Sequence, residues 1–225
     1  MNFLQLVQRV QLECGVSGAA PATVVGQPAE INRLVKWVNS SWIDIQNERQ
    51  DWEWMRGSCS FVTIAAQATY TPVQCGITDF GAWDKDSFRN YETAAGSGSE
   101  IFMDYIDYET WRDTYQFGSM RTSYSRPMDI SITPLKALAL GQVPTAGYTI
   151  VGDYFKIPSE LALDADIPAI PTQYHMAIVY GAMLSYGGYE AASEVYQRAE
   201  IGYKKIMRRL RNDQLPDVTF AGALA

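Results

Sequence analysis

The chain has 225 residues, of which 47% are hydrophobic and 19% charged, so it can bury the core of one large domain or two modest ones and is not a disordered chain. Its net charge of −7 argues against the broad positive surface that general nucleic-acid binding needs. No apolar run approaches the ~20 residues of a membrane helix, and the start, MNFLQLVQRVQLECG, lacks the features of a signal peptide, so we expect a protein made and kept in a cytoplasm.

The first part of the chain has the period of amphipathic helices. One helix is predicted from Asn2 to about Cys14, because its apolar residues share one stripe and Gly15 can end it. A second helix is predicted to begin at Pro28 and to run to about Met55, which makes a rod of roughly 40 Å.

Tryptophans lie along more than one face of this second helix, at Trp37, Trp42, Trp52 and Trp54. A single antiparallel neighbour cannot cover so many indoles, and tryptophan is enriched at the centres of interfaces. Two interpretations therefore stay open: a surface for other subunits, and a thick core within one chain.

From Gly57 to about Ser159 the sequence is typical of strands and loops. SFVTIAAQATYTP predicts a hairpin with AAQA at its bend, and DYETWRDTY (107–115) predicts a short helix capped by Asp107. PMDISITP predicts a short strand between prolines, near a sheet edge. VPTAGYTIVGDYFKIP predicts one or two strands, with Gly147 and Gly152 as turn or bulge points.

A helical period returns after a series of prolines, Pro158, Pro168 and Pro171, which we expect to stiffen the connection into the next helix. One helix is predicted from about Pro171, and a final helix to about Arg211. Small residues recur on one face of each, so the two are expected to pack closely as a hairpin joined through the pair 187–188, both glycines.

The order of elements predicts an α+β fold, an antiparallel helical bundle of two N-terminal and two C-terminal helices with an inserted β-rich domain. The expected boundaries are 1–56 and 160–211 for the bundle, 57–159 for the insert and 212–225 for a C-terminal tail.

The three cysteines, Cys14, Cys59 and Cys75, are odd in number and have no CxxC spacing. This pattern argues against a disulfide framework or a zinc site and favours small buried side chains.

Positive charge is concentrated in one place. Residues 198–211, RAEIGYKKIMRRLR, hold six bases and one acid, which leaves 12 bases against 24 acids elsewhere. Favourable interaction with the helix C-terminus accounts for part of this cluster only. The rest suits a partner with an acidic groove, or subunits that pack a basic end against an acidic flank.

We find no active site to argue for. The single histidine, His175, has no metal-ligating residue one helical turn away, and no GxSxG or GxxxxGK[ST] motif is present. Carboxylates are close in sequence at three pairs, and all three are predicted to lie in solvated loops: Asp84 and Asp86, Asp104 and Asp107, and Asp164 and Asp166. We therefore expect no enzyme and no cofactor.

Several blocks in order carry a resemblance to a known family. They are the Trp-rich helix ending near DWEWMRG, the block SEIFMDYIDYETWRDTY, and GYTIVGDYFKIPSELALDADIPAIPTQYHMAIVYGAML. From about residue 28 onward the chain resembles the head-completion adaptors of tailed bacteriophages, the head-to-tail connectors beneath the portal ring.

The resemblance implies a structural virion protein: a ring, usually of twelve subunits, that joins the portal of the head to the tail or nozzle and continues the DNA channel without specific DNA binding. Such a protein is expected in the virion, at the head–tail interface, and in the host cytoplasm during assembly. The inter-subunit candidates are Trp37, Trp42 and Trp54. The portal-docking candidates are Arg208, Arg209, Arg211, Leu215, Phe220 and Leu224.

Two other functions remain as alternatives. One is a tail-associated peptidoglycan hydrolase that uses a carboxylate pair, with Asp104 and Asp107 as the pair to test. The other is a DNA-binding regulator that uses the basic last helix, whose affinity for DNA would fall steeply with salt.

Overall fold

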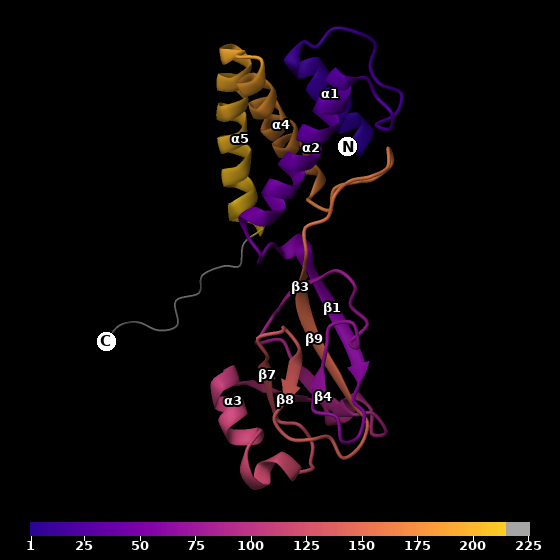
Figure 1. Cartoon of the computed structure of the whole chain (residues 1–225), viewed down its shortest axis with the longest axis vertical. Coiled ribbons are helices and arrows are strands. Elements are labelled where there is room, and N and C mark those ends of the chain that lie inside the picture. Colours follow the sequence, from indigo (N-terminus) through magenta and orange to yellow (C-terminus); the bar gives the residue numbers. More distant parts are fainter. Residues whose placement is uncertain (215–225) are drawn as a thin grey trace, which may run out of the picture. The chain divides into compact units, whose positions relative to one another are not determined.

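The computed structural model describes residues 1–214, and it divides into two units, each with its own core. Unit one contains Met1–Met55 and the segment from Pro158 onward, and unit two contains Arg56–Ile157. Unit one is helical and unit two carries the strands, so the predicted α+β class is confirmed (Figure 1).

Unit one begins with α1 (Phe3–Cys14), whose predicted limits are confirmed. The N–H of Gln5 donates to the Asn2 side chain at 2.9 Å, and the N–H of Asn2 donates to the Gln5 side chain at 3.0 Å, which forms a capping box. Gly15 ends the helix in the left-handed conformation, with φ of 68°.

The second helix, α2 (Ala29–Glu48), is shorter than predicted, and a 3-10 turn, η1 (Glu53–Met55), follows it separately. Its length is therefore about 30 Å rather than 40 Å. Pro28 precedes the helix as its N-cap. Arg49 is extended, and the chain then turns back so that Trp52 Nε1 donates to the carbonyl of Ile45 at 3.0 Å. The buried indole thus satisfies a carbonyl near the helix end, which the apolar period alone does not reveal.

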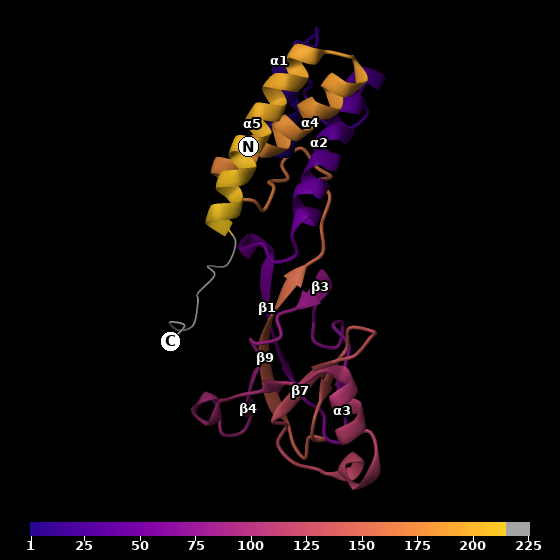
Figure 2. The same ribbon diagram turned by 90° about the vertical axis from the view of Figure 1, so that its left-hand side faces the viewer.

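Two further helices complete unit one. A 3-10 turn, η4 (Thr172–Tyr174), leads into α4 (His175–Tyr189), and α5 (Ser193–Gln214) follows and ends three residues later than predicted. Helix α4 packs against α1, α2 and α5 (Figures 1 and 2). This central position explains why its apolar residues are not confined to one face.

The α4–α5 hairpin was predicted to turn at the glycine pair 187–188, and this prediction is wrong, because Gly187 and Gly188 are both inside α4. The turn lies at 190–192, where Ala191 has a φ of 53°. Gly187 instead allows close packing, because a Cβ there would lie 3.0 Å from the backbone nitrogen of Tyr196 on α5. Gly202 on α5 gives the same close approach to the ring of Tyr180.

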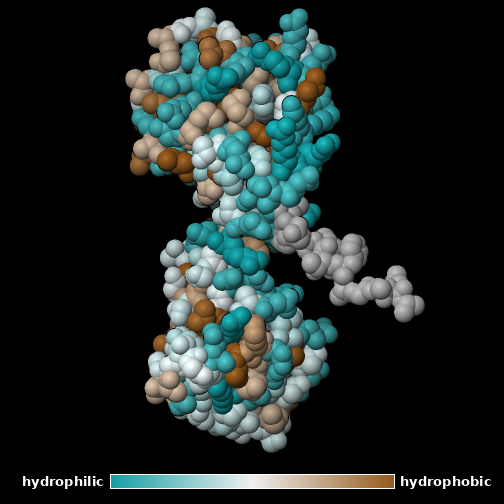
Figure 3. Space-filling view, turned by 180° about the vertical axis from the view of Figure 1, so that it is seen from behind, coloured by the Kyte–Doolittle hydropathy of each residue, from teal (hydrophilic) through white to brown (hydrophobic). Residues whose placement is uncertain are grey.

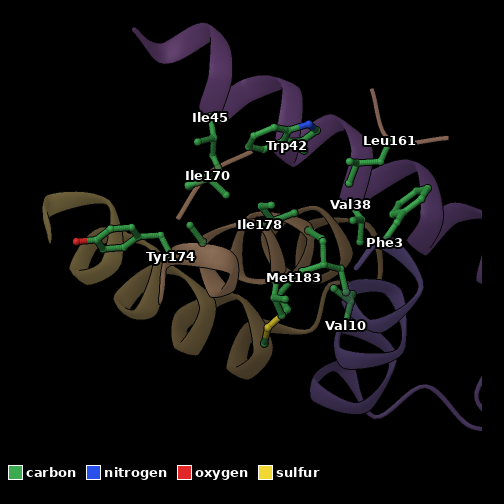
Figure 4. Packing of buried hydrophobic residues seen from close by; sticks show 14 of the residues in the cluster. Phe3, Val10, Val38, Trp42, Ile45, Leu161, Ile170, Tyr174, Ile178 and Met183 are labelled. Carbon is green, nitrogen blue, oxygen red and sulfur yellow. The ribbon is translucent and has the colours of Figure 1, made fainter. Parts of the chain in front are cut away.

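The core of unit one collects side chains from α1, α2, α4 and the segment that precedes α4. In Figure 4, Trp42 and Ile45 of α2 lie close to Ile170 and Ile178, and Phe3 of α1 lies near Leu161. The connecting segment is therefore part of the core, not a loop that runs over it.

Unit two contains a first sheet built around β9 (Tyr148–Lys156). This strand pairs antiparallel with β1 (Arg56–Val62), β3 (Phe80–Trp83) and β4 (Arg89–Glu92), and β4 pairs with β5 (Ile101–Phe102). Strand β9 is one continuous strand, so Gly152 is neither a turn nor a bulge. It lies under the ring of Phe88, whose Cδ1 would be 2.4 Å from a Cβ at this position.

The predicted hairpin at SFVTIAAQATYTP is wrong. Strand β1 belongs to the first sheet, whereas β2 (Thr69–Tyr70) belongs to a second sheet with β8 (Leu138–Leu140), β7 (Asp129–Ile132) and β6 (Asp104–Tyr105). The chain does turn at the predicted bend, but it crosses between sheets. The Tyr70 hydroxyl fixes the crossing, because it accepts from the N–H of Ile64 at 2.8 Å and donates to the carbonyl of Gln67 at 3.0 Å.

Strand β7 is also not at the edge that PMDISITP predicted, since it lies between β8 and β6. Pro127 and Pro134 fall outside its four residues, so every strand N–H can pair. The short helix α3 (Tyr108–Tyr115) is confirmed, with Asp107 as its N-cap, and its Trp111 Nε1 donates to the carbonyl of Leu140 at 2.9 Å. Two 3-10 turns, η2 (Ser97–Ser99) and η3 (Gly118–Thr122), complete the unit.

Candidate docking surface

The basic cluster of the sequence forms one exposed face near the end of α5. Four side chains line an open groove of about 350 Å³, and all four are exposed: Lys204, Lys205, Arg208 and Arg209. They gather there because positions three and four apart on a helix are neighbours on its surface. Figure 3 shows hydrophilic residues along the surface of this helix.

Some of the cations near this face have anionic partners within unit one. Lys204 pairs with Glu200 one turn earlier at 2.6 Å, and Arg211 pairs with Glu48 of α2. The hydrogen bond that Lys204 donates to Glu200 raises the pKa of Lys204 above its usual value. These two side chains therefore contribute little unbalanced charge.

On this face, three cations have no anionic partner among residues 1–214: Lys205, Arg208 and Arg209. Because they lie within two helical turns, their repulsion is uncompensated in the isolated subunit. A negatively charged partner surface would relieve it.

A second groove, of about 250 Å³, adjoins this face between α4 and α5. Lys205 and Arg209 stand at its edge, and the other lining residues are mostly apolar or small: Gln173, Met176, Tyr180, Gly202 and Ile206. The face can thus hold an acidic group and bury an apolar side chain beside it.

The predicted docking residues have different surroundings. Arg208 and Arg209 lie on the groove, and Arg211 is held by Glu48. Leu215, Phe220 and Leu224 lie outside the described residues, as does most of the predicted tail 212–225. Lys204 and Lys205 also line the groove. They were not among the predicted docking residues, although they belong to the basic segment 198–211.

The predicted inter-subunit tryptophans also differ in exposure. Trp42 is 1% exposed and belongs to the core, so it offers no surface to a neighbouring subunit. Its assignment as an inter-subunit residue is therefore replaced by that of a core residue. Trp54 is half-buried and stacks on Trp42, with 5.2 Å between ring centroids. The core is thicker than one antiparallel neighbour could make it, because α2 contacts both α1 and α4.

Trp37 is half-buried and belongs to an aromatic patch on unit one. Its ring lies 6.2 Å from that of Tyr186 and 5.6 Å from that of Tyr189, and the guanidinium of Arg33 lies 4.7 Å from the Tyr189 ring centroid. Tyr189 remains 59% exposed. This patch keeps apolar area available for another chain.

His175 is a core residue. It is 1% exposed, its Nε2 donates to the carbonyl of Ile170 at 3.1 Å, and its Nδ1 lies 2.6 Å from the amino group of Met1. Burial, and then the positive charge of that amine, lower the pKa of His175 below its usual value. His175 is thus a buried histidine that is bonded to its neighbours at the start of α4.

The paired carboxylates hold local structure. Asp107 caps α3, Asp164 accepts from the N–H of Val24 at 2.6 Å, and Asp166 accepts from the N–H groups of 162 and 163. Asp84 pairs with Arg56 at 3.2 Å. At least one member of each pair thus serves the fold, and nothing in these contacts favours the hydrolase alternative.

The cysteines are free and buried, as expected, and burial raises the pKa of Cys14 to about 12, of Cys59 to about 11 and of Cys75 to about 12. Among residues 1–214, no three His, Cys, Asp or Glu side chains are grouped to hold a metal ion. No helix in the described part of the chain has the length and hydropathy to cross a membrane.

The family model described as SU10 adaptor protein matches residues 1–222, which is almost the whole chain. No curated protein matches the sequence.

Proposed function

Because the chain belongs to the SU10 adaptor protein family, a family of bacteriophage structural adaptors, we propose that it forms a ring that joins the portal of the phage head to the tail and continues the DNA channel. The family match agrees with the resemblance to phage head-completion adaptors that the sequence shows. The finer assignment of a ring of twelve subunits follows from the resemblance.

The observation that carries the portal-docking role is the uncompensated charge of Lys205, Arg208 and Arg209 on α5. In a chain of net charge −7, three neighbouring cations without partners among the described residues are best explained by an acidic surface on another protein. The predicted tail, 212–225, follows this face directly in sequence and is proposed to dock with it.

The ring itself is proposed to close through head-to-tail contacts between helical units. The aromatic patch of Arg33, Trp37 and Tyr189 and the half-buried Trp54 supply the apolar area for such contacts. An acidic chain repels DNA, so DNA would pass the channel without adhering to its wall.

Unit two is proposed to meet the tail or nozzle protein. The protein would then be found in the virion at the head–tail interface, and in the host cytoplasm during assembly. No cofactor or catalytic step is part of this role.

Charge reversal tests the docking role directly. The variant Arg208→Glu/Arg209→Glu is expected to bind purified portal rings about tenfold or more weakly, and the wild-type affinity is expected to fall with salt. The single variants Arg209→Glu and Lys36→Glu form the charge-matched comparison, because each changes the net charge equally and Lys36 is an exposed cation on α2 that makes no ion pair within residues 1–214. Equal loss in both variants would show that only net charge matters.

Removal of Gln214–Ala225 tests the tail. Phage heads assembled with the truncated protein are expected to lack the adaptor and to lose DNA. If they still bind it and retain DNA, the tail does not dock. Electron microscopy of the protein mixed with portal would give the number of subunits.

A further inference from the structure

Strand β1 is an edge strand of the first sheet in unit two. The sheet order is β1-β9-β4-β5, so β1 pairs on one side only, in a continuous antiparallel register from Arg56 opposite Phe155 to Val62 opposite Thr149 (Figure 1). With seven residues it is long for an edge strand that is left open.

The register shows which backbone groups of β1 are free. Cys59 and Phe61 lie opposite Gly152 and Ile150, their side chains are buried, and the next inward residue, Thr63, donates its N–H to β9 at 2.8 Å. In an antiparallel pair, hydrogen bonds to one neighbour come from alternate residues. The N–H and C=O groups of Ser58, Ser60 and Val62 therefore point away from β9, and no hydrogen bond to them is found within residues 1–214.

This open stretch has a defined end. Both backbone groups of Ile64, the next residue on the same side, are occupied: its N–H donates to the Tyr70 hydroxyl at 2.8 Å and its carbonyl accepts from the N–H of Gln67 at 3.1 Å, so no further strand pairing is possible there. Arg56, at the start of the strand, is the next outward residue in the other direction, so the uncharged outward residues are three, and they are centred on Ser60.

The usual protection of an edge is missing from these three residues. None is lysine or proline, and the β1–β9 register has no bulge. The nearest charge on the strand, Arg56, is held by Asp84 and Asp153 at 3.2 and 3.7 Å.

The other edges of the same sheet are short or capped. Strand β5 has only two residues. On β3, the carbonyl of Gly81 accepts from Nζ of Lys136 at 2.9 Å. A neighbouring copy therefore has no matching long edge in this sheet other than its own β1.

We propose that two copies of this protein pair through β1, antiparallel and centred on Ser60, so that the two sheets become one. In this register Ser60 lies opposite Ser60 of the second copy, and Ser58 lies opposite Val62 of the second copy. All the outward N–H and C=O groups of these residues are then bonded.

A second copy fits this edge better than a charged partner does. Ser58, Ser60 and Val62 carry no charge, and Arg56 would lie opposite Ile64 of the second copy rather than opposite another cation, so two identical strands meet without repulsion. Val62, which is 52% exposed, gains a neighbour on the partner strand. The pairing uses unit two only and concerns the free protein, so it is independent of the docking face on α5. It would keep an edge prone to aggregation covered before assembly.

Cysteine cross-linking of the full chain tests the register. Opposed residues of a hydrogen-bonded antiparallel pair have Cα atoms about 5.5 Å apart, within the range of a disulfide. Ser60→Cys is expected to form a covalent dimer under mild oxidation. Ser58→Cys is the matched control, since its symmetry mate is out of reach, and Ser58→Cys/Val62→Cys is expected to restore cross-linking. The native cysteines are buried, and the cross-linking that wild type shows under the same conditions is the background to subtract.

Sedimentation of the same proteins gives a second measurement. Wild type is expected at no less than twice the subunit mass, and Ser60→Lys, which places like charges opposite each other, is expected to halve that mass while Ser60→Thr leaves it unchanged. Cross-linking at Ser60→Cys no greater than at Ser58→Cys would overturn the proposal. Loss of the dimer in Ser60→Lys with full portal binding would separate this pairing from the docking role.

Discussion

The carboxamide of Asn39 on α2 binds the backbone of Leu161 in both directions. Its Nδ2 donates to the Leu161 carbonyl at 2.8 Å, and its Oδ1 accepts from the Leu161 N–H at 2.9 Å. Gln46 makes the same pair of bonds with Ser159, both at 3.0 Å. The two side chains hold the segment that leaves the strands against α2, as a neighbouring strand would.

Removal of this clamp is expected to cost stability. Asn39→Ala leaves a part-buried N–H and a carbonyl without partners, so the free energy of unfolding is expected to fall by about 1–3 kcal/mol. Asn47→Ala, on the exposed side of the same helix, is the matched control and is expected to change it by less than about 0.5 kcal/mol. Urea unfolding of both variants checks this, and equal effects would show that the clamp is not what stabilises the segment.

Two adjacent glycines on α4 are expected to respond in opposite ways. A Cβ at Gly187 would lie 2.9 to 3.1 Å from atoms of Tyr196, including its backbone, so Gly187→Ala is expected to destabilise the protein by about 1–3 kcal/mol. Gly188 has nothing within 4 Å of its Cβ position, so Gly188→Ala is expected to stabilise the helix by up to about 1 kcal/mol. Thermal unfolding of the pair gives the comparison, and the same sign in both variants would contradict the proposed close contact.

Stability is expected to depend on pH through His175. Its pKa in the folded protein is lowered from 6.5, so the unfolded state binds more protons once the pH falls below about that value. The free energy of unfolding is therefore expected to decrease as pH drops through this window, by at most about 1.4 kcal/mol per pH unit. His175→Gln is expected to remove this component while the carboxylates contribute equally in both proteins. Parallel pH profiles for the two proteins would rule out the effect.

Substitutions of Trp42 and Trp37 are expected to have different effects, the first on folding stability and the second on assembly. Trp42→Ala empties a core position and is expected to lower the free energy of unfolding by about 3–5 kcal/mol. Trp37→Ala removes a half-buried ring and is expected to cost less stability but to weaken ring formation on the portal. Unfolding curves and electron microscopy of portal mixtures give the two readouts. If Trp37→Ala assembles normally, the aromatic patch is not an inter-subunit contact.

The sequence determined the features that depend on neighbouring residues. The limits of α1, the cap of α3 at Asp107, the basic cluster on the last helix and the α+β class all follow from local period, capping chemistry and charge spacing. The family resemblance also depends only on the order of residues. These signals hold because each is decided within a few turns of backbone.

Only the tertiary structure decided where partners distant in sequence meet. Trp52 folding back on Ile45, β1 and β2 entering different sheets, and Trp42 lying in the core each depend on contacts that no local period encodes. The same holds for Arg211, which Glu48 pairs, and for Lys205 and Arg209, which stand beside an apolar groove. Packing and hydrogen bonding between segments far apart in the chain can override local preference. The local sequence therefore did not determine where these residues lie.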